Sequence, residues 1–70
     1  MKFQVGDRVE WIAAPRYVGT VTGIILDRIT VMWEDPDNNN EPASKATNPA
    51  DRHRLIERDP NPDKYEIDCD

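Results

Sequence analysis

The alternation of apolar and polar residues in the first half of the chain constrains the fold more than any other feature of the sequence. It runs through residues 8–11, 19–24 and 29–33. Successive side chains of a strand point to opposite faces, so this period of two predicts strands with one buried face. Gly19 and Gly23 fall on the same side of the second stretch, where a missing Cβ permits a close approach or a sharp bend. The pattern predicts a small, strongly bent antiparallel sheet.

The supply of large apolar residues is small for a chain of 70 residues. A single core of this size only marginally offsets the conformational entropy of ordering the chain, so we expect nearly every large apolar side chain to be buried. The predicted core comprises Phe3, Val5, Val9, Trp11, Ile12, Val18, Val21, Ile24, Ile25, Leu26, Ile29, Val31, Met32, Trp33, Leu55 and Ile56. The single cysteine, Cys69, has no partner for an internal disulfide. Stability therefore has to come from packing.

Turn-forming residues punctuate the first half of the chain. Residues 6–7, Gly-Asp, predict a turn before the first confident strand, and the polar pair at 27–28 predicts a hairpin between the second and third strands. Residues 15–17 are placed in a loop between the first and second strands. Residues 34–42 are rich in proline, asparagine and acidic side chains, which predicts another loop.

The second half of the chain carries weaker signals. Residues 43–47 predict a short fourth strand, and residues 48–51, in which asparagine precedes proline, predict a single helical turn. Leu55 and Ile56 predict a last strand that returns to the core. From residue 59 onward, two prolines and five acidic side chains against one lysine predict a mobile acidic tail.

These motifs resemble the SH3-like small barrels of the KOW and Tudor type. The resemblance rests on the opening Val5-Gly6-Asp7-Arg8-Val9, the Gly-x-Val-x-x-Ile of residues 19–24 and the Val-x-Trp of residues 31–33. It covers about residues 3–58. It implies an all-β, five-stranded SH3-like barrel at residues 1–58, with a short helical turn before the last strand, followed by the tail at residues 59–70. Fold alone does not fix function in this class.

Tudor-like readers hold a methylated cation in a cage of aromatic side chains by cation–π attraction, and Trp11, Tyr17 and Trp33 could supply such a cage. Trp11 and Trp33 lie on the apolar faces of their predicted strands, so we interpret both as core residues. Tyr17, beside Arg16, is the better candidate for an exposed aromatic side chain.

The residue inventory argues against an enzyme. Ser44, His53 and Cys69 are the single serine, histidine and cysteine of the chain, and neighbouring residues offer no arrangement of nucleophile and base. Plasmid-type dihydrofolate reductases share the Gly-Asp-Arg-Val opening, but their Val-Gln-Ile-Tyr catalytic segment is missing here. Residues 35–41 imitate the first half of a calcium loop and then lack its glycine and its final glutamate. We therefore predict no catalytic residue, cofactor or metal.

The net charge is −5 and lies in the second half of the chain. Residues 1–33 carry four basic and three acidic side chains, whereas residues 34–70 carry five and eleven. An acidic chain lacks the counterion release that drives general binding to nucleic acid, so the predicted partner is a protein with a basic surface. No apolar stretch approaches the ~20 residues that span a bilayer, and no signal peptide is recognisable. We expect no membrane partner and a cytoplasmic location.

The only basic cluster consists of Arg52, His53 and Arg54, with Arg58, and Lys45 could join it. Two interpretations stay open. The guanidinium groups could bind a phosphate or carboxylate, or they could neutralise neighbouring acidic residues or the tail, which we favour. His53 is interpreted as an ordinary surface histidine.

The leading hypothesis is a noncatalytic, regulatory or accessory protein-binding module that uses its barrel loops and acidic surface. The candidate partner-binding residues are Arg16, Tyr17, Glu34, Asp35, Asp37, Arg52, Arg54 and Tyr65. The alternatives are a KOW-like nucleic-acid-binding module, an acidic DNA mimic that inhibits a nucleic-acid-binding protein and, disfavoured, the small reductase. Self-association is compatible with each of them.

Overall fold

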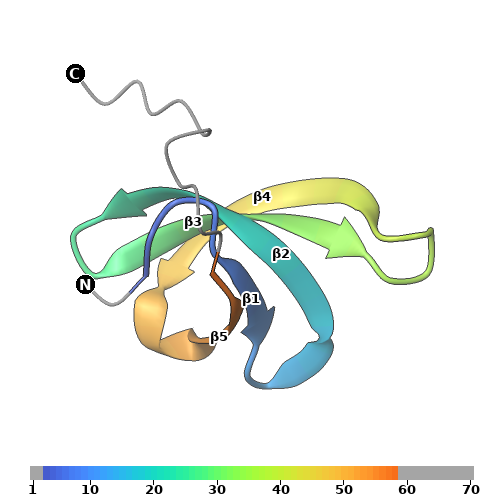
Figure 1. The fold of residues 1–70 in the computed structure, drawn as a ribbon, viewed down its shortest axis with the longest axis horizontal. Coiled ribbons are helices and arrows are strands. Elements are labelled where there is room, and N and C mark those ends of the chain that lie inside the picture. Colours follow the sequence, from blue (N-terminus) through green and yellow to red (C-terminus); the bar gives the residue numbers. More distant parts are fainter. Residues whose placement is uncertain (1–2, 59–70) are drawn as a thin grey trace.

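The computed structural model describes residues 3–58, which form a single antiparallel sheet. Figure 1 shows the strands curving strongly around one another. The elements are β1 (Arg8–Trp11), β2 (Ala14–Ile25), β3 (Arg28–Asp35), β4 (Glu41–Pro49), the 3₁₀ helix η1 (Ala50–Arg52) and β5 (His53–Glu57). The prediction of an all-β fold with five strands and one helical turn before the last strand is confirmed. Within residues 3–58, no helix is long and apolar enough to cross a membrane.

The sheet has the strand order β4-β3-β2-β1-β5. Among the described residues β4 and β5 do not pair, so they form the two edges of an open sheet and the barrel is not closed. The predicted acidic tail at residues 59–70 lies outside the described residues.

Strand β2 is the longest, with 12 residues, and it supplies the bend that the glycines predicted. Its register with β3 shifts between Val21 and Gly23, which marks a β-bulge. At Gly19 a Cβ atom would lie 2.5 Å from Val31 Cγ1 and 2.6 Å from the carbonyl oxygen of Met32. The close packing of β2 on β3 therefore requires glycine at position 19.

The predicted turn at residues 6–7 is present and ties the start of the chain to β2. Gly6 has φ 98°, a conformation that glycine adopts without steric cost. Its N–H donates to the carbonyl oxygen of Val21 at 2.8 Å, and the Val21 N–H donates to that of Asp7 at 2.9 Å.

The β3–β4 hairpin is longer and its turn shorter than predicted. Strand β3 continues to Asp35 and β4 begins at Glu41, so only residues 36–40 form the turn instead of residues 34–42. Asn39 and Asn40 have φ 56° and 57°, the left-handed region that asparagine tolerates better than most residues. Two consecutive left-handed residues reverse the chain tightly, which lets β4 cover nine residues rather than five.

The core is much smaller than the apolar residues of the sequence predicted. Among residues 3–58, five apolar side chains are buried, namely Phe3, Val9, Val21, Ile29 and Val31. Trp33 and Ala50 pack against them. The prediction that nearly all large apolar residues are buried is wrong for Ile12, Ile24, Ile25, Leu26, Leu55 and Ile56, which are exposed. An open sheet this small encloses only one narrow interior. The ends of its strands extend beyond this interior, so the apolar residues there stay exposed.

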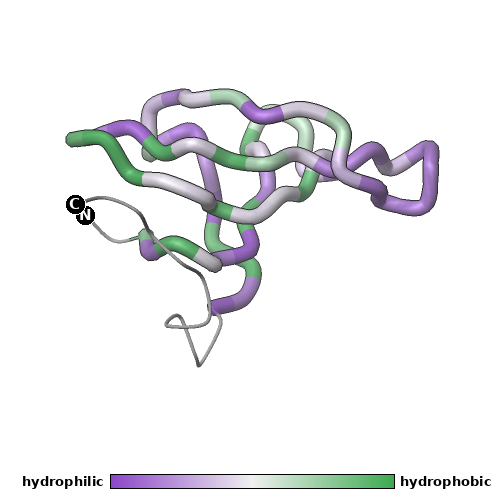
Figure 2. Tube along the Cα trace, turned by 90° about the horizontal axis from the view of Figure 1, so that it is seen from above, coloured by the Kyte–Doolittle hydropathy of each residue, from purple (hydrophilic) through white to green (hydrophobic). Residues whose placement is uncertain are grey.

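Two ends of the molecule have opposite character. The β2–β3 hairpin ends in the exposed apolar residues 24–26, and the β3–β4 hairpin ends in polar and acidic residues. Figure 2 shows these apolar and hydrophilic tips at opposite ends of the sheet. Leu26 at the apolar tip has φ 55° and is 89 % exposed.

Candidate functional site

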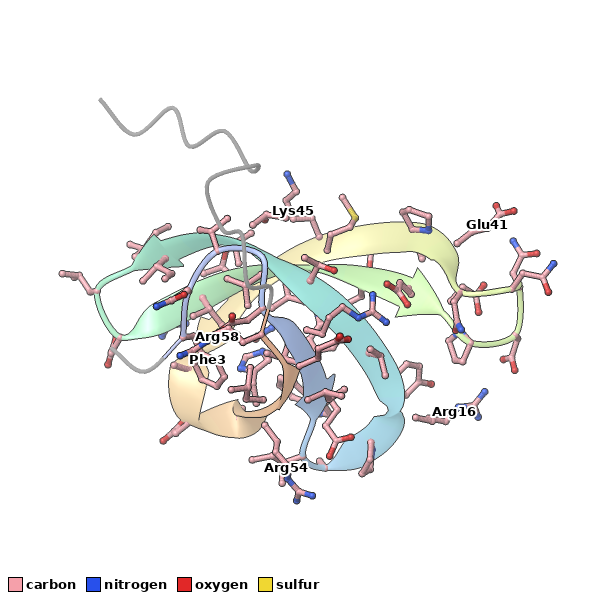
Figure 3. The ribbon with its side chains drawn as sticks, viewed as in Figure 1. Phe3, Arg16, Glu41, Lys45, Arg54 and Arg58 are labelled. Atoms are coloured by element: carbon pink, nitrogen blue, oxygen red, sulfur yellow. The ribbon has the colours of Figure 1, made fainter. Side chains whose placement is uncertain are left out.

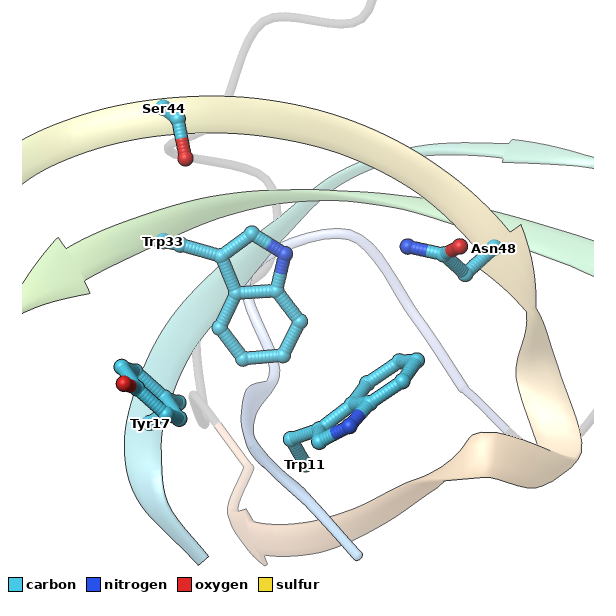
Figure 4. A pocket seen from close by; sticks show the side chains of 5 residues that line it. All are labelled: Trp11, Tyr17, Trp33, Ser44 and Asn48. Atoms are coloured by element: carbon cyan, nitrogen blue, oxygen red, sulfur yellow. The ribbon is translucent and has the colours of Figure 1, made fainter. Parts of the chain in front are cut away.

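An open pocket lined by aromatic side chains is the most distinctive surface feature of the described residues. Its lining consists of Trp11, Tyr17, Trp33, Ser44 and Asn48, and its volume is about 340 Å³. Figure 4 shows Trp33 between Tyr17 and Trp11, with the two polar side chains on β4. The volume lies at the small end of the ~300–1,000 Å³ typical of ligand pockets, which suits a single side chain better than a large cofactor. We call it the aromatic pocket.

Strand register explains how this pocket is assembled. Trp33 of β3 pairs with Ser44 of β4, and Ile29 pairs with Asn48. Ser44 and Asn48 are an even number of residues apart on one strand, so both face the same side of the sheet. Trp11 follows a register shift at the end of β1 and meets Trp33 edge to face, with ring centroids 6.0 Å apart and an interplanar angle of 87°.

The predicted residues Arg16, Tyr17 and Asp37 come together beside this pocket. The Arg16 guanidinium donates to Asp37 Oδ1 at 2.8 Å, and its Cζ atom lies 5.5 Å from the ring centroid of Tyr17. Residues 15–17 lie in strand β2 and not in the predicted loop, and Figure 3 shows Arg16 on the side of the β3–β4 hairpin. Tyr17 is exposed as predicted.

The interpretation of the two tryptophans as core residues is only partly right. Trp33 packs against the buried cluster, but both Trp33 and Trp11 are partly exposed and line the aromatic pocket. Each indole therefore has one side in the protein and one side toward the pocket. Ser44 and Asn48 were not predicted as site residues. Ser44 fell in the predicted fourth strand, but Asn48 was assigned to the helical turn at residues 48–51, so the sequence did not place the two on one face of β4.

Two further predicted site residues, Glu34 and Asp35, have structural partners. Glu34 forms a salt bridge with Arg8 of β1. Asp35 organises the hairpin turn, because its carboxylate accepts from the Asp37 N–H at 2.9 Å and its carbonyl oxygen accepts from the Asn40 N–H at 2.9 Å. Both residues lie at the end of β3, next to the turn at residues 36–40. Part of their hydrogen-bonding and ion-pairing capacity is already used.

Two arginines of the predicted basic cluster pair with acidic residues of the first part of the chain. Arg54 pairs with Glu10 at 3.2 Å, because the two are cross-strand neighbours in β5 and β1. Arg58 donates to both carboxylate oxygens of Asp7, at 3.1 and 3.0 Å, which raises the pKa of its guanidinium. Within residues 3–58, Arg54 and Arg58 are thus neutralised by acidic residues from the first part of the chain, while Asp59 and the predicted tail lie outside the described residues. Arg52 forms none of the salt bridges within residues 3–58.

His53 is not a surface histidine. It is 2 % exposed, and its ring stacks on Trp33 with an interplanar angle of 14° and a centroid distance of 5.7 Å. Trp11 and Phe3 contact it edge-on at centroid distances of 5.3 and 6.4 Å. Burial lowers the pKa of His53 below its ordinary value of 6.5, against smaller opposing effects of the Ala50 and Pro49 carbonyls and of Asp51. Burial of His53 was not predicted from the sequence, because Leu55 and Ile56 are the more apolar residues of the same strand and were expected to face the core.

A second open pocket of about 550 Å³ lies behind His53, with Phe3, Ile12, Asp51, Arg54, Leu55 and Arg58 in its lining. Both of its arginines are already paired with carboxylates, and Asp51 adds a negative charge. An anion would have to compete with those carboxylates, so the aromatic pocket is the better candidate site. The predicted site residue Tyr65 lies outside the described residues.

Among the side chains of residues 3–58, no group of three or more histidine, cysteine, aspartate or glutamate residues is placed to hold a metal ion. A comparison of the chain with models of protein families, with curated proteins and with solved structures found no match. Fold and site together define a small, open all-β protein with an aromatic pocket at its surface.

Proposed function

We propose that this chain is a noncatalytic protein-binding module that receives a lysine or arginine side chain of a basic partner in the aromatic pocket. The observation that carries the proposal is the convergence of three aromatic rings from three strands on one small open pocket. Exposed aromatic rings attract cations through the negative face of the π system. The pocket lining itself contains no cationic side chain that would repel such a group.

The charge around the pocket supports a basic partner. Asp37 is neutralised by Arg16, which lies beside Tyr17. The negative charge at this hairpin therefore comes from Asp35 and Glu41, at the ends of β3 and β4. Complementary charge across an interface guides encounter and excludes wrong partners. A regulatory or accessory role in the cytoplasm, and a place among barrels of the KOW and Tudor type, are part of the same proposal.

Nucleic-acid binding has less support. Of the arginines that could form a basic stripe, Arg8, Arg16, Arg54 and Arg58 each pair with a carboxylate. Paired guanidinium groups add little to the counterion release on which nonspecific nucleic-acid binding depends.

The first test uses small probes of defined chemistry. The amides of N-acetyl-arginine, N-acetyl-lysine and N-acetyl-trimethyl-lysine are titrated into ¹⁵N-labelled protein, with N-acetyl-norleucine amide as the uncharged analogue of lysine. The proposal expects the cations to shift the indole N–H signals of Trp11 and Trp33, and norleucine to shift them far less. Equal shifts with norleucine, or no shifts with any probe, would contradict a cation-binding pocket.

The second test asks whether the pocket binds a protein. Wild-type chain, Tyr17→Ala and the matched control Tyr17→Phe are used for capture, and each captured protein is then purified and its binding measured directly. Removal of the Tyr17 ring should weaken binding about two- to fivefold, since an exposed cation–π contact contributes about 0.5–1 kcal/mol, whereas Tyr17→Phe keeps the ring. A purified partner that binds Tyr17→Ala as tightly as wild type does not use this pocket.

A further inference from the structure

The buried His53 connects the aromatic pocket to the interior. Trp11 and Trp33 line the pocket and also contact the His53 ring, Trp33 face to face and Trp11 by its edge. Any movement of this imidazole therefore acts on two of the three aromatic rings of the pocket. His53 is held at this place because it is the first residue of β5 and pairs with Trp11 in the ladder.

The hydrogen bonding of His53 defines its neutral form. Nδ1 lies 3.3 Å from the carbonyl oxygen of Ala50. A carbonyl only accepts, so Nδ1 carries the proton and Nε2 has a free lone pair. Nε2 is buried without a hydrogen-bond partner within residues 3–58.

A second proton has to bind at this buried Nε2. It would create an N–H donor without an acceptor and a charge in an apolar environment, and both are unfavourable. The indoles of Trp33 and Trp11 act in the opposite direction, because cation–π attraction stabilises the protonated imidazole. Burial has the largest effect on the imidazole, so the neutral form is favoured until the pH falls below 6.5.

Charged groups on the surrounding elements do not reverse this preference. Asp51 of η1 and the carbonyl groups of Pro49 and Ala50 favour the proton, but by less than burial opposes it. The remaining charged residues on the elements packed around the ring are Arg8 and Glu10 on β1, Arg28, Glu34 and Asp35 on β3, Arg52 on η1, Arg54 and Glu57 on β5, and Asp7 with Arg58 at the ends of the sheet. Arg8, Arg54 and Arg58 are paired with Glu34, Glu10 and Asp7, respectively.

We propose that His53 makes the aromatic pocket sensitive to acid: the neutral imidazole holds Trp11 and Trp33 in place, and protonation of Nε2 displaces the ring and disrupts the arrangement of the two indoles. This step rests on the proposed function: a cationic side chain bound in the pocket is released at pH values below the midpoint of His53 protonation. The neutral fraction of a histidine falls about tenfold per pH unit below its pKa, so the affinity falls by up to the same factor.

The test is an NMR titration of the free protein between pH 7.5 and 4.5, with the imidazole carbons of His53 and the indole N–H groups of Trp11 and Trp33 observed together. We expect one common midpoint below 6.5. Acrylamide quenching of tryptophan fluorescence should increase at least twofold through the same midpoint, while the amide spectrum stays that of a folded protein. His53→Phe is the matched variant, because phenylalanine keeps an aromatic ring in the stack and does not titrate.

Each other outcome overturns the inference. These are a His53 midpoint at or above 6.5, no protonation of the folded protein down to pH 4.5, indoles that do not respond when His53 titrates, and the same indole response in His53→Phe. If His53→Phe does not fold, the inference is judged on the wild-type protein alone. It then holds only if the His53 imidazole and the two indole signals titrate with the same midpoint. If N-acetyl-lysine amide fails to bind at pH 7.5, the proposed function is wrong, yet the free-protein titration still decides whether His53 controls the indoles.

Discussion

Arg58 holds the carboxylate of Asp7 with two hydrogen bonds, of 3.1 and 3.0 Å, across 51 residues of sequence. Asp7 is 1 % exposed and also accepts from the N–H of Gln4 at 2.9 Å. This contact joins the turn before β1 to the residue after β5. It therefore connects the two ends of the described chain, on a sheet whose edges do not close.

We expect Asp7→Ala to destabilise the fold by about 2–3 kcal/mol, because it removes a buried, charge-assisted acceptor and leaves the Gln4 N–H without a partner. Urea denaturation followed by tryptophan fluorescence measures this directly. Asp37→Ala is the control, since its salt bridge with Arg16 is exposed and such pairs contribute at most about 1 kcal/mol. Equal losses in the two variants would show that burial of Asp7 has no energetic consequence.

Substitution of the two β2 glycines should have opposite effects. Gly19→Ala places a Cβ atom 2.5 Å from Val31 Cγ1 and 2.6 Å from the Met32 carbonyl oxygen, and overpacking of this kind costs about 1–3 kcal/mol. At Gly23 the nearest atom would be Thr30 Cβ at 3.7 Å, an ordinary contact.

Gly23→Ala should therefore stabilise the protein by about 0.5 kcal/mol through a less flexible unfolded chain. Thermal denaturation of both variants beside wild type measures the difference. A Gly19→Ala protein as stable as Gly23→Ala would mean that β2 and β3 are not packed this closely.

The strands could be predicted from the sequence because period-two alternation is a local property. Val9, Ile29 and Val31 are buried as that pattern requires. The extent of the core could not be predicted, because it depends on whether the sheet closes. At the open edge β5, Leu55 and Ile56 face solvent and only His53 turns inward.

The aromatic pocket was partly accessible from the sequence. Tyr17 could be identified as an exposed aromatic residue from its place beside Pro15 and Arg16, and Asp37 from its place in the acidic loop. The double role of Trp33 could not, because an alternating pattern separates two faces and does not describe a side chain that lies between core and surface. Ion pairs such as that of Glu10 with Arg54 depend on the register of β1 with β5, which the sequence of either strand leaves open.

Leu26 in the β2–β3 turn is a site where substitution should stabilise the fold. Its φ of 55° is unfavourable for a residue with a branched side chain, by roughly 1–2 kcal/mol. Its side chain is almost fully exposed, so little packing is lost on replacement. Leu26→Gly or Leu26→Asn should gain about 0.5–1 kcal/mol in urea denaturation. Leu26→Ala keeps a Cβ atom and lacks the short polar side chain by which asparagine hydrogen-bonds locally in this conformation. It should gain nothing, so an equal gain in all three would assign the effect to lost apolar surface instead.

The stability of the whole protein should also depend on the protonation of His53. Its pKa in the folded protein is lowered below 6.5 by burial, whereas the unfolded chain keeps the ordinary value. Below about pH 6.5 the unfolded state therefore binds more protons, and the free energy of unfolding decreases as the pH falls toward the folded pKa, by up to about 1.4 kcal/mol for each unit of difference. Above pH 6.5 His53 contributes no pH dependence.

The measurement is urea denaturation of wild type and His53→Phe at several pH values between 7.5 and 5, because subtracting the variant removes the contribution of the carboxylates. Wild type should lose stability relative to His53→Phe as the pH decreases, and the difference should be constant above about 6.5. A difference that is constant over the whole range would mean that the cation–π attraction of Trp11 and Trp33 balances the burial of the imidazole, and a wild type that gains stability in acid would mean that it outweighs burial.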